Sequence, residues 1–340
     1  MPHRITILPS GRCFESEGDD TILQAALDAG LQLPYGCRNG ACGACKGRVA
    51  SGRIDRGEFQ EQALSAADVA AGHALLCCSR ALSDLSIECP EVGSPRGIAV
   101  KTLPCRVQRL ELLAPDVMAV DLVLPASERL QFVAGQYIDI LLKDGRRRSF
   151  SLANAPHDDA CLQLHVRRIA GGYFTGHVFE TMCERDILRL EGPHGSFCLR
   201  EDDVRPALLV AGGTGFAPLK AMIEDALHRR LPRAMTLYWG ARDRAGLYAA
   251  GLAESWRARG VGFVPVLSEP TAGDRWTGRA GLVHDAVLAD LPDLSGYQAY
   301  VCGTPAMVEA AHRDFVRRGG LKEEDFIADS FSFAAEPSPT

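Results

Sequence analysis

Three cysteines lie close together in a glycine-rich stretch near the N-terminus. They are Cys37, Cys42 and Cys45, spaced C-x4-C-x2-C. This spacing is typical of a [2Fe–2S] cluster loop, which needs a fourth cysteine from further along the chain. The small residues between the cysteines let the backbone wrap closely around a cluster and direct N–H groups at its sulfurs. Zinc fits less well, because zinc sites usually gather two short-spaced pairs and only one C-x-x-C occurs here.

Candidates for the fourth cluster ligand are Cys77 and Cys78, which are adjacent in the sequence. Spacing alone leaves both open. The six other cysteines outside the nucleotide motif described below stand singly in apolar surroundings. Without an export signal structural disulfides are unexpected, so we expect these six to be small buried hydrophobes. They are Cys13, Cys89, Cys105, Cys161, Cys183 and Cys198.

Two stretches in the middle of the chain could meet phosphate groups. Arg146–Asn154 begins with three consecutive arginines, and Gly171–Thr175 leads into a stretch of helical character. A basic triplet beside a strand is commonly a solvated edge. A glycine pair at a helix N-terminus can receive a phosphate, although alone the signal is weak.

A third stretch combines a strand, a glycine turn and a helix. The apolar run Ala207–Ala211 meets Gly212–Pro218, and an amphipathic helix follows. Such an arrangement binds phosphates. It differs from the dinucleotide pattern G-x-G-x-x-G because Pro218 occupies the third glycine position. Another predicted strand, Gln298–Val301, ends in Cys302–Pro305, at the carboxyl end where ligands bind in parallel sheets.

The elements that must position these residues fall into three groups. The N-terminal segment reads as a small α+β unit with strands at 4–8 and 85–87, and a helix around 22–27 that Asp20 caps and Gly30 ends. The middle segment has β-type runs separated by turns, as in a small antiparallel barrel. The C-terminal segment alternates strands and helices, as in a doubly wound α/β sheet. The β-type runs of the middle segment are 105–110, 117–124, 137–142 and 161–169. Two predicted strands of the C-terminal segment are 236–239 and 261–267.

Composition and charge limit the classes of protein to which the chain can belong. The 340 residues are 46% hydrophobic and 24% charged, which suits two or three globular domains. A net charge of −6 argues against nucleic-acid binding. A membrane span is not expected, since no run of about 18 apolar residues occurs. The first residues lack the apolar core of a secretory signal, so we expect a cytoplasmic protein.

Taken together, the motifs resemble those of three-module reductases in the ferredoxin–NADP reductase superfamily. The resemblance implies a β-grasp plant-type ferredoxin over 1–93, a linker over 94–103, an antiparallel β-barrel FAD domain over 104–202, and a doubly wound parallel α/β NAD(P) domain over 203–340. It also favours Cys77 over Cys78 as the fourth ligand, beside Cys37, Cys42 and Cys45.

The FAD residues follow from the same resemblance. Arg148-Ser149-Phe150-Ser151 is similar to the family's Arg-x-Tyr-Ser motif, in which the arginine holds the pyrophosphate, the aromatic ring packs on the flavin and the last serine faces flavin N5. Phe150 replaces the usual tyrosine, so one hydroxyl contact is lost. The second FAD motif corresponds to Gly171, Gly172 and Thr175.

The nucleotide residues are implied in the same way. The two motifs place one group of residues beside the coenzyme: Gly212, Gly213, Thr214, Gly215, Pro218, Cys302, Gly303 and Pro305. Cys302 is expected near the nicotinamide, and Phe331 near the C-terminus is the candidate to cover the flavin. The residues expected at the reacting atoms are therefore Ser151, Cys302 and Phe331.

The resemblance implies a hydride from NADH to FAD, then single electrons to the [2Fe–2S] cluster and on to a partner enzyme. Arg242 could meet the 2′-phosphate of NADPH and Asp243 a ribose hydroxyl. Relatives favour NADH. The sequence looks most like the reductases of the CDP-6-deoxy-hexulose 3-dehydrase type. The alternatives are the reductase component of an aromatic-ring or phenol oxygenase, a flavin oxidase or diaphorase, and a non-catalytic electron-carrying or redox-sensing subunit.

Overall fold

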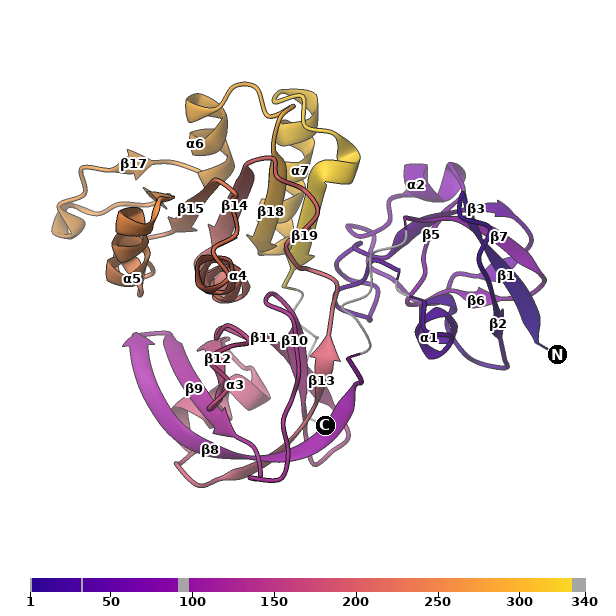
Figure 1. Ribbon diagram of the computed structural model, residues 1–340, viewed down its shortest axis with the longest axis horizontal. Coiled ribbons are helices and arrows are strands. Elements are labelled where there is room, and N and C mark those ends of the chain that lie inside the picture. Colours follow the sequence, from indigo (N-terminus) through magenta and orange to yellow (C-terminus); the bar gives the residue numbers. More distant parts are fainter. Residues whose placement is uncertain (1, 32, 91–97, 332–340) are drawn as a thin grey trace. The chain divides into compact units, whose positions relative to one another are not determined.

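The computed structural model describes residues 2–31, 33–90 and 98–331. The chain forms two compact units, Met1–Gly97 and Ile98–Thr340, and each is considered by itself (Figure 1). The first unit is α+β, and the second contains an antiparallel barrel followed by a parallel α/β sheet. The fold class expected from the sequence is confirmed. Its exact domain boundaries stay a prediction.

A five-stranded mixed sheet forms the first unit, in the order β2-β1-β7-β3-β5, with β1 and β7 parallel. Alternation along β1 buries Ile5 and Ile7 completely in a core shared with helix α1. A separate pair, β4 with β6, lies outside this sheet. The elements are β1 (His3–Leu8), β2 (Cys13–Ser16), α1 (Ile22–Asp28), β3 (Lys46–Ser51), β4 (Ile54–Asp55), α2 (Ala66–Ala70), β5 (His73–Leu75), β6 (Arg80–Ala81) and β7 (Leu85–Glu88).

Helix α1 begins one residue later than the sequence suggested. Thr21, rather than Asp20, is the N-cap, and its hydroxyl accepts a hydrogen bond from the Gln24 N–H at 3.2 Å. Either side chain could have served, since aspartate and threonine are both good caps. The helix ends at Asp28, and Gly30 follows with φ +73°.

Six antiparallel strands form the barrel, in the order β11-β10-β13-β8-β9-β12. A bridge between Leu152 and Leu164 joins its two outer strands. Strand β13 was not predicted, because Gly192-Pro193 interrupts its apolar pattern. Strand β8 begins at Lys101, inside the predicted linker, of which 94–97 lie outside the described residues. The elements are β8 (Lys101–Ala114), β9 (Val117–Val123), β10 (Tyr137–Leu141), β11 (Arg147–Ser151), β12 (Leu162–Arg167), α3 (Tyr173–Glu180) and β13 (Ile187–His194).

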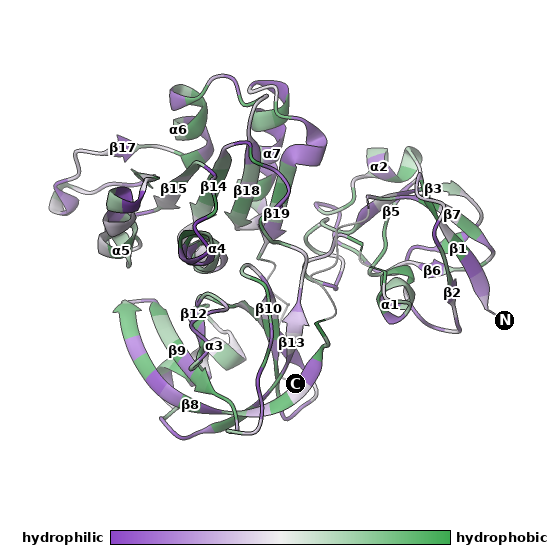
Figure 2. Ribbon diagram, in the orientation of Figure 1, coloured by the Kyte–Doolittle hydropathy of each residue, from purple (hydrophilic) through white to green (hydrophobic). Residues whose placement is uncertain are grey.

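An all-parallel sheet, in the order β17-β16-β15-β14-β18-β19, forms the last third of the chain. Alternate residues of β14 enter different cores: Leu209 joins α4 and α5, and Leu208 joins α6 and α7. The strands are therefore buried on both faces, and hydrophobic residues run along them in Figure 2. The elements are β14 (Ala207–Gly212), α4 (Phe216–His228), β15 (Met235–Ala241), α5 (Ala250–Ser255), β16 (Val261–Leu267), β17 (Arg279–Ala280), α6 (Val283–Asp290), β18 (Gln298–Gly303), α7 (Pro305–Arg317) and β19 (Phe326–Ser330). Within the described ranges, none of the helices combines the length and apolar character that a membrane crossing demands.

Of the six cysteines expected in the core, Cys89 and Cys105 are buried, Cys161 and Cys198 are half-buried, and two are exposed, Cys13 and Cys183. Cys13 occupies an outward-facing position of β2, and Cys183 precedes β13 in a turn. The expectation was wrong for these two because the apolar neighbours of each belong to the opposite face of a strand or to the adjoining element. All twelve cysteines have free thiols.

An ion pair with a buried carboxylate ties together the segments that lead into β14 and β19 of the nucleotide sheet. The carboxylate of Asp325, with 3% of its side chain exposed, accepts two hydrogen bonds from the Arg205 guanidinium at 2.6 and 2.7 Å. Arg205 also contacts Asp203 through Nε at 3.0 Å. Hydrogen bonding to Arg205 lowers the pKa of Asp325 below its ordinary value.

We predict that Asp325→Asn lowers the free energy of unfolding of this sheet by about 2 kcal/mol, since the half-buried Arg205 guanidinium loses the buried one of its two acidic partners. The three tryptophans lie at 239, 256 and 276, so tryptophan fluorescence during urea unfolding reports on this sheet. Because the folded-state pKa of Asp325 is lowered, the difference should be complete above pH about 4 and shrink as the pH falls further. Exposed Asp202→Asn is the control, and equal midpoints for both variants would contradict the assignment.

Candidate cofactor sites

Four thiols of the first unit lie close together, those of Cys37, Cys42, Cys45 and Cys77. The Cys37 backbone N–H donates to Cys42 Sγ at 3.3 Å, and the Ala41 N–H donates to Cys37 Sγ at 3.4 Å. Hydrogen bonds from Cys42 and Cys45 lower the pKa values of Cys37 and Cys77, respectively. Thiolates are the iron ligands, and N–H groups aimed at sulfur stabilise them.

Glycines give the cluster loop its close packing. Gly40 has φ +75°, and a Cβ there would lie 2.8 Å from Cys78 Sγ and 2.9 Å from the Glu58 carbonyl oxygen. Gly43 also has a positive φ, +77°. A side chain at Gly40 would therefore push the loop away from the turn that carries Cys77. The four predicted ligands fit a [2Fe–2S] cluster, and their assignment stays a prediction.

Strand β11 carries the first predicted FAD motif. Arg148 and Phe150 alternate with Ser149, whose hydroxyl donates to the buried Asp139 carboxylate at 2.6 Å. Ser149 is thus engaged on the strand face opposite Arg148 and Phe150. The Phe150 ring lies 5.3 Å from the ring of Phe174 in α3, which brings the two FAD motifs together.

The beginning of α3 carries the second motif. Gly171 has φ +74°, and Gly172 caps the helix without a side-chain hydrogen bond, so the first helical N–H groups are not capped by it. Thr175 Oγ1 accepts from the Ile169 N–H at 3.2 Å. A Cβ on Gly172 would lie 2.6 Å from that oxygen. This cradle at a helix N-terminus fits a phosphate of FAD. Ser151, the remaining predicted FAD residue, lies at the end of β11 with 7% exposure.

The nucleotide loop Gly212–Gly215 lies against the end of β18. A Cβ on Gly215 would lie 2.1 Å from the Cys302 carbonyl oxygen, and one on Gly212 would lie 2.4 Å from Met307 Sδ. Gly215 is also the N-cap of α4, with no side-chain cap, while Pro218 is buried in the first turn and Thr214 is partly exposed. This backbone arrangement fits a phosphate, and the role of the loop in coenzyme binding stays a prediction.

The second nucleotide motif is more deeply buried than expected. Cys302 is 0% exposed, and burial raises the pKa of its thiol, which therefore stays protonated. Gly303 ends β18, its carbonyl accepts from the Phe331 N–H at 2.8 Å, and Pro305 is the first residue of α7. The Phe331 side chain packs against the α4 core. Ser332 and Phe333, which the sequence placed in the same closing strand, lie outside the described residues.

Two residues that sequence reasoning missed meet at Gly213. The Trp239 indole N–H donates to the Gly213 carbonyl at 2.9 Å, and its ring stacks on Phe216 at 3.9 Å. The Arg167 guanidinium, from the barrel, lies 3.3 Å from the position of a Gly213 Cβ. Arg167 Nε is buried and forms an ion pair with the Asp116 carboxylate at 3.6 Å, but it has no hydrogen-bond partner among the described residues. No motif marks Arg167, which is the last residue of the barrel strand β12.

Barrel and nucleotide sheet also meet through two buried polar contacts. The His165 ring nitrogen Nδ1 and the Tyr248 hydroxyl are 3.0 Å apart. Lys220 of α4 donates to the Ala153 carbonyl, just after β11, at 3.0 Å. These contacts hold the barrel, which carries the predicted flavin strand β11, against the sheet that carries the predicted nucleotide loop.

Three family models match consecutive parts of the chain: the 2Fe-2S iron-sulfur cluster binding domain over 5–82, the oxidoreductase FAD-binding domain over 104–198 and the oxidoreductase NAD-binding domain over 209–313. The CDP-6-deoxy-L-threo-D-glycero-4-hexulose-3-dehydrase reductase of Yersinia pestis is 40% identical and covers 97% of this chain and 99% of its own. The terephthalate 1,2-dioxygenase reductase component 2 of Comamonas sp. is 38% identical and covers 98% of each chain. This chain belongs to the iron–sulfur flavoprotein reductases.

A solved structure agrees with this assignment. The Amycolatopsis cytochrome P450 reductase GcoB superposes with a TM-score of 0.77 at 36% identity, covering 97% of this reductase and 98% of its own chain. The reductase is an oxidoreductase whose domains are those for a [2Fe–2S] cluster, FAD and NAD(P). The suspected family is confirmed. When bound, FAD accepts a hydride from the nicotinamide and releases electrons singly, and the cluster carries one electron at a time.

We predict that Arg148→Ala weakens FAD binding by the reductase at least about tenfold, because a charged contact to a phosphate is lost. Flavin retained after dilution and gel filtration measures this. Exposed Arg189→Ala, on β13 of the same barrel, is the control and should keep its flavin. Full flavin occupancy in Arg148→Ala would assign the pyrophosphate to other residues.

We predict that Arg167→Ala raises the KM for the nicotinamide coenzyme about tenfold while FAD content stays unchanged, since its guanidinium lies against the nucleotide loop. Steady-state ferricyanide reduction measures KM and kcat separately. The neighbouring Arg168 contacts Glu180 instead, so Arg168→Ala is the matched control. A fall in kcat with unchanged KM would place Arg167 outside the coenzyme site.

Proposed function

We propose that the reductase takes electrons from NADH and delivers them to a CDP-6-deoxy-hexulose 3-dehydrase. The observation that carries the electron path is the presence, in one chain, of the converging thiols, the Gly172–Thr175 cradle and the Gly212–Gly215 loop. In this proposal Arg148 and Thr175 bind the FAD pyrophosphate. Phe150, Ser151 and Phe331 lie at the flavin ring, and Cys302 lies near the nicotinamide.

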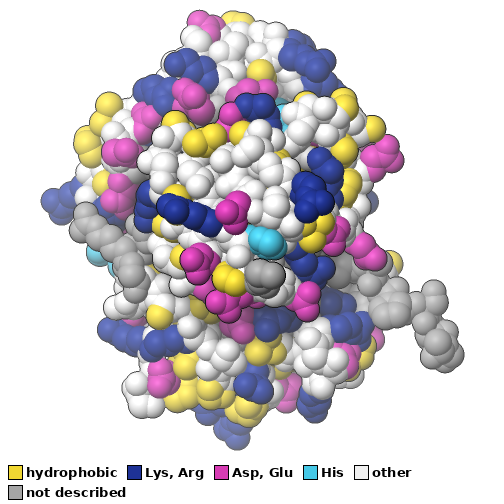
Figure 3. Space-filling view, turned by 90° about the vertical axis from the view of Figure 1, so that its right-hand side faces the viewer, with side chains coloured by type: hydrophobic (Ala, Val, Ile, Leu, Met, Phe, Trp, Pro, Cys, Tyr) yellow, Lys and Arg dark blue, Asp and Glu magenta, His cyan; other side chains and the backbone are white. Residues whose placement is uncertain are grey.

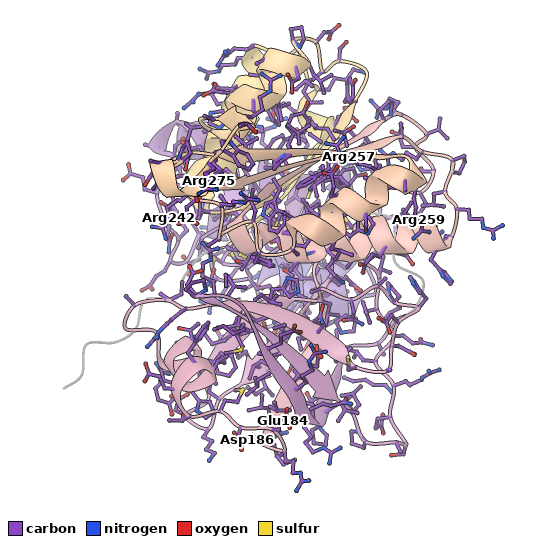
Figure 4. The ribbon with its side chains drawn as sticks, turned by 90° about the vertical axis from the view of Figure 1, so that its left-hand side faces the viewer. Glu184, Asp186, Arg242, Arg257, Arg259 and Arg275 are labelled. Atoms are coloured by element: carbon purple, nitrogen blue, oxygen red, sulfur yellow. The ribbon has the colours of Figure 1, made fainter. Side chains whose placement is uncertain are left out.

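Charge at the ribose end of the nucleotide site supports NADH. The loops after β15 and β16, 242–244 and 268–275, contain three arginines and three acidic residues, so they carry no excess positive charge for a 2′-phosphate. Asp243 Oδ1 accepts from the Gly246 N–H at 3.0 Å, and Arg244 binds Asp274. Arg242 and Arg275 project from these loops (Figure 4). They are the side chains to replace if NADPH proves to be the donor.

The choice of acceptor rests on relatives. The dehydrase reductase of Yersinia and the oxygenase reductase component of Comamonas are similarly close, so an aromatic-ring oxygenase is the second candidate. Residues 1–93 contain eight basic and twelve acidic side chains, a net charge of −4, which suits a basic partner. Among the described side chains on the face in Figure 3, acidic and basic groups are interspersed. Surface charge therefore does not discriminate between the two acceptors. Twelve free cysteines fit the reducing conditions of the cytoplasm, where we place the protein.

The experiment is an anaerobic absorbance titration of the full chain with NADH and, separately, NADPH, after iron, sulfide and flavin have been quantified. We expect about two irons and one FAD per chain, and bleaching of both the flavin and the cluster bands by NADH. Response to NADPH alone would overturn the choice of coenzyme. Flavin bleaching without a cluster signal would overturn the electron path. Addition of each purified acceptor to the reduced protein then decides between dehydrase and oxygenase.

We predict that Cys42→Ser abolishes cytochrome c reduction while NADH–ferricyanide activity largely persists, because ferricyanide can take electrons from the flavin directly. Both activities are followed in the same preparation. Cys161→Ser, a half-buried cysteine of the barrel unit, is the control and should retain both. Equal loss of the two activities in Cys42→Ser would contradict a separable flavin and cluster.

A further inference from the structure

A fifth thiol lies beside the predicted cluster ligands. Cys78 Sγ is 3.6 Å from Cys77 Sγ, a distance at which one sulfur can donate a hydrogen bond to the other. Four cysteines suffice for the cluster, so Cys78 has no ligand role left. We propose that Cys78 is a positioning residue that donates an S–H···S hydrogen bond to the Cys77 ligand and raises the reduction potential of the cluster. The proposal rests on the cluster ligand set of the proposed function.

The direction of the bond follows from the chemistry of the ligand. A cysteine bound to iron is a thiolate, which has no proton to donate. Cys77 is therefore the acceptor, and the proton must be on Cys78 Sγ. The bond is weak compared with an N–H···S bond, but its acceptor is a ligand atom that shares the charge of the cluster.

The turn around Cys78 fixes the position of its sulfur. The Cys78 N–H donates to the Leu75 carbonyl at 3.0 Å, and the Cys78 carbonyl packs on Gly57, where a Cβ would lie 2.5 Å away. On the other side Cys78 Sγ lies over Gly40, in the space that a side chain would otherwise fill. The cluster loop, the Gly57 turn and the strand β5 thus hold this thiol against the ligand.

The direction in which the reduction potential shifts distinguishes the hydrogen bond from a change in solvent access. Reduction adds negative charge to the cluster, so a donor to a ligand sulfur favours the reduced form and raises the potential. Removing the donor lowers the potential. Water entering a space left by a smaller side chain would also stabilise the added charge, and would therefore raise the potential.

The test is a spectroelectrochemical titration of the cluster in the full chain, with iron, sulfide and flavin quantified first. We expect Cys78→Ala and Cys78→Val to keep two irons per chain and to shift the midpoint potential to more negative values. Valine fills the site without a donor, so it controls for solvent entry. Cys78→Ser retains a donor and should remain near the wild-type potential, and Cys13→Ala, an exposed thiol of the same unit, should not change it.

Three outcomes would overturn the inference. Wild-type potentials in both Cys78→Ala and Cys78→Val would show that the bond does not act on the cluster. A potential that rises in these variants would assign the effect to water. Loss of iron in Cys78→Ala, with iron retained in Cys77→Ala, would make Cys78 the ligand. Wild-type protein that holds no cluster would instead refute the proposed function.

Discussion

The nucleotide half of the molecule depends on one contact between backbones. Gly215 lies so close to Cys302 that a Cβ added to it would be only 2.1 Å from the Cys302 carbonyl oxygen. The contact joins two segments about ninety residues apart in the chain. Because β14 and β18 are neighbours in the parallel sheet, their carboxyl ends meet, and the absent side chain allows both loops to face the same ligand.

The barrel obeys a related constraint, set by strand register. The pairing of β10 with β11 places Ser149 opposite Asp139, so the serine hydroxyl donates a hydrogen bond to this buried carboxylate. Arg148 and Phe150 then share the other face. A shift of one residue would exchange these two sets, and the guanidinium would point into the polar interior around Asp139. Contact between Phe150 and Phe174 fixes the same face against α3.

Much of this could be predicted because the motifs are local. The cysteine loop, the glycine cradle before α3 and the strand–turn–helix at 207–228 each combine short spacing with a backbone requirement, and short spacing is visible in a sequence. Arg167 and Trp239 could not be predicted, because their importance comes from meeting Gly213, which Arg167 reaches from the barrel and Trp239 from the neighbouring strand β15. The cap of α1 was misplaced by one residue, where two capping residues compete. Strand β13 was missed because Gly192-Pro193 disturbs the alternation on which strand prediction relies.

The contact between His165 and Tyr248 has a consequence for how the barrel and the nucleotide sheet respond to acidity. Burial lowers the pKa of His165 to about 3 and raises that of Tyr248, so both rings are neutral across the physiological range. The unfolded chain would take up a proton on this histidine near its ordinary pKa of about 6.5. Acidification below that value therefore favours unfolding of the His165–Tyr248 contact rather than a change in its charge. Between neutral pH and that value, the contact between the barrel and the nucleotide sheet keeps the same charge.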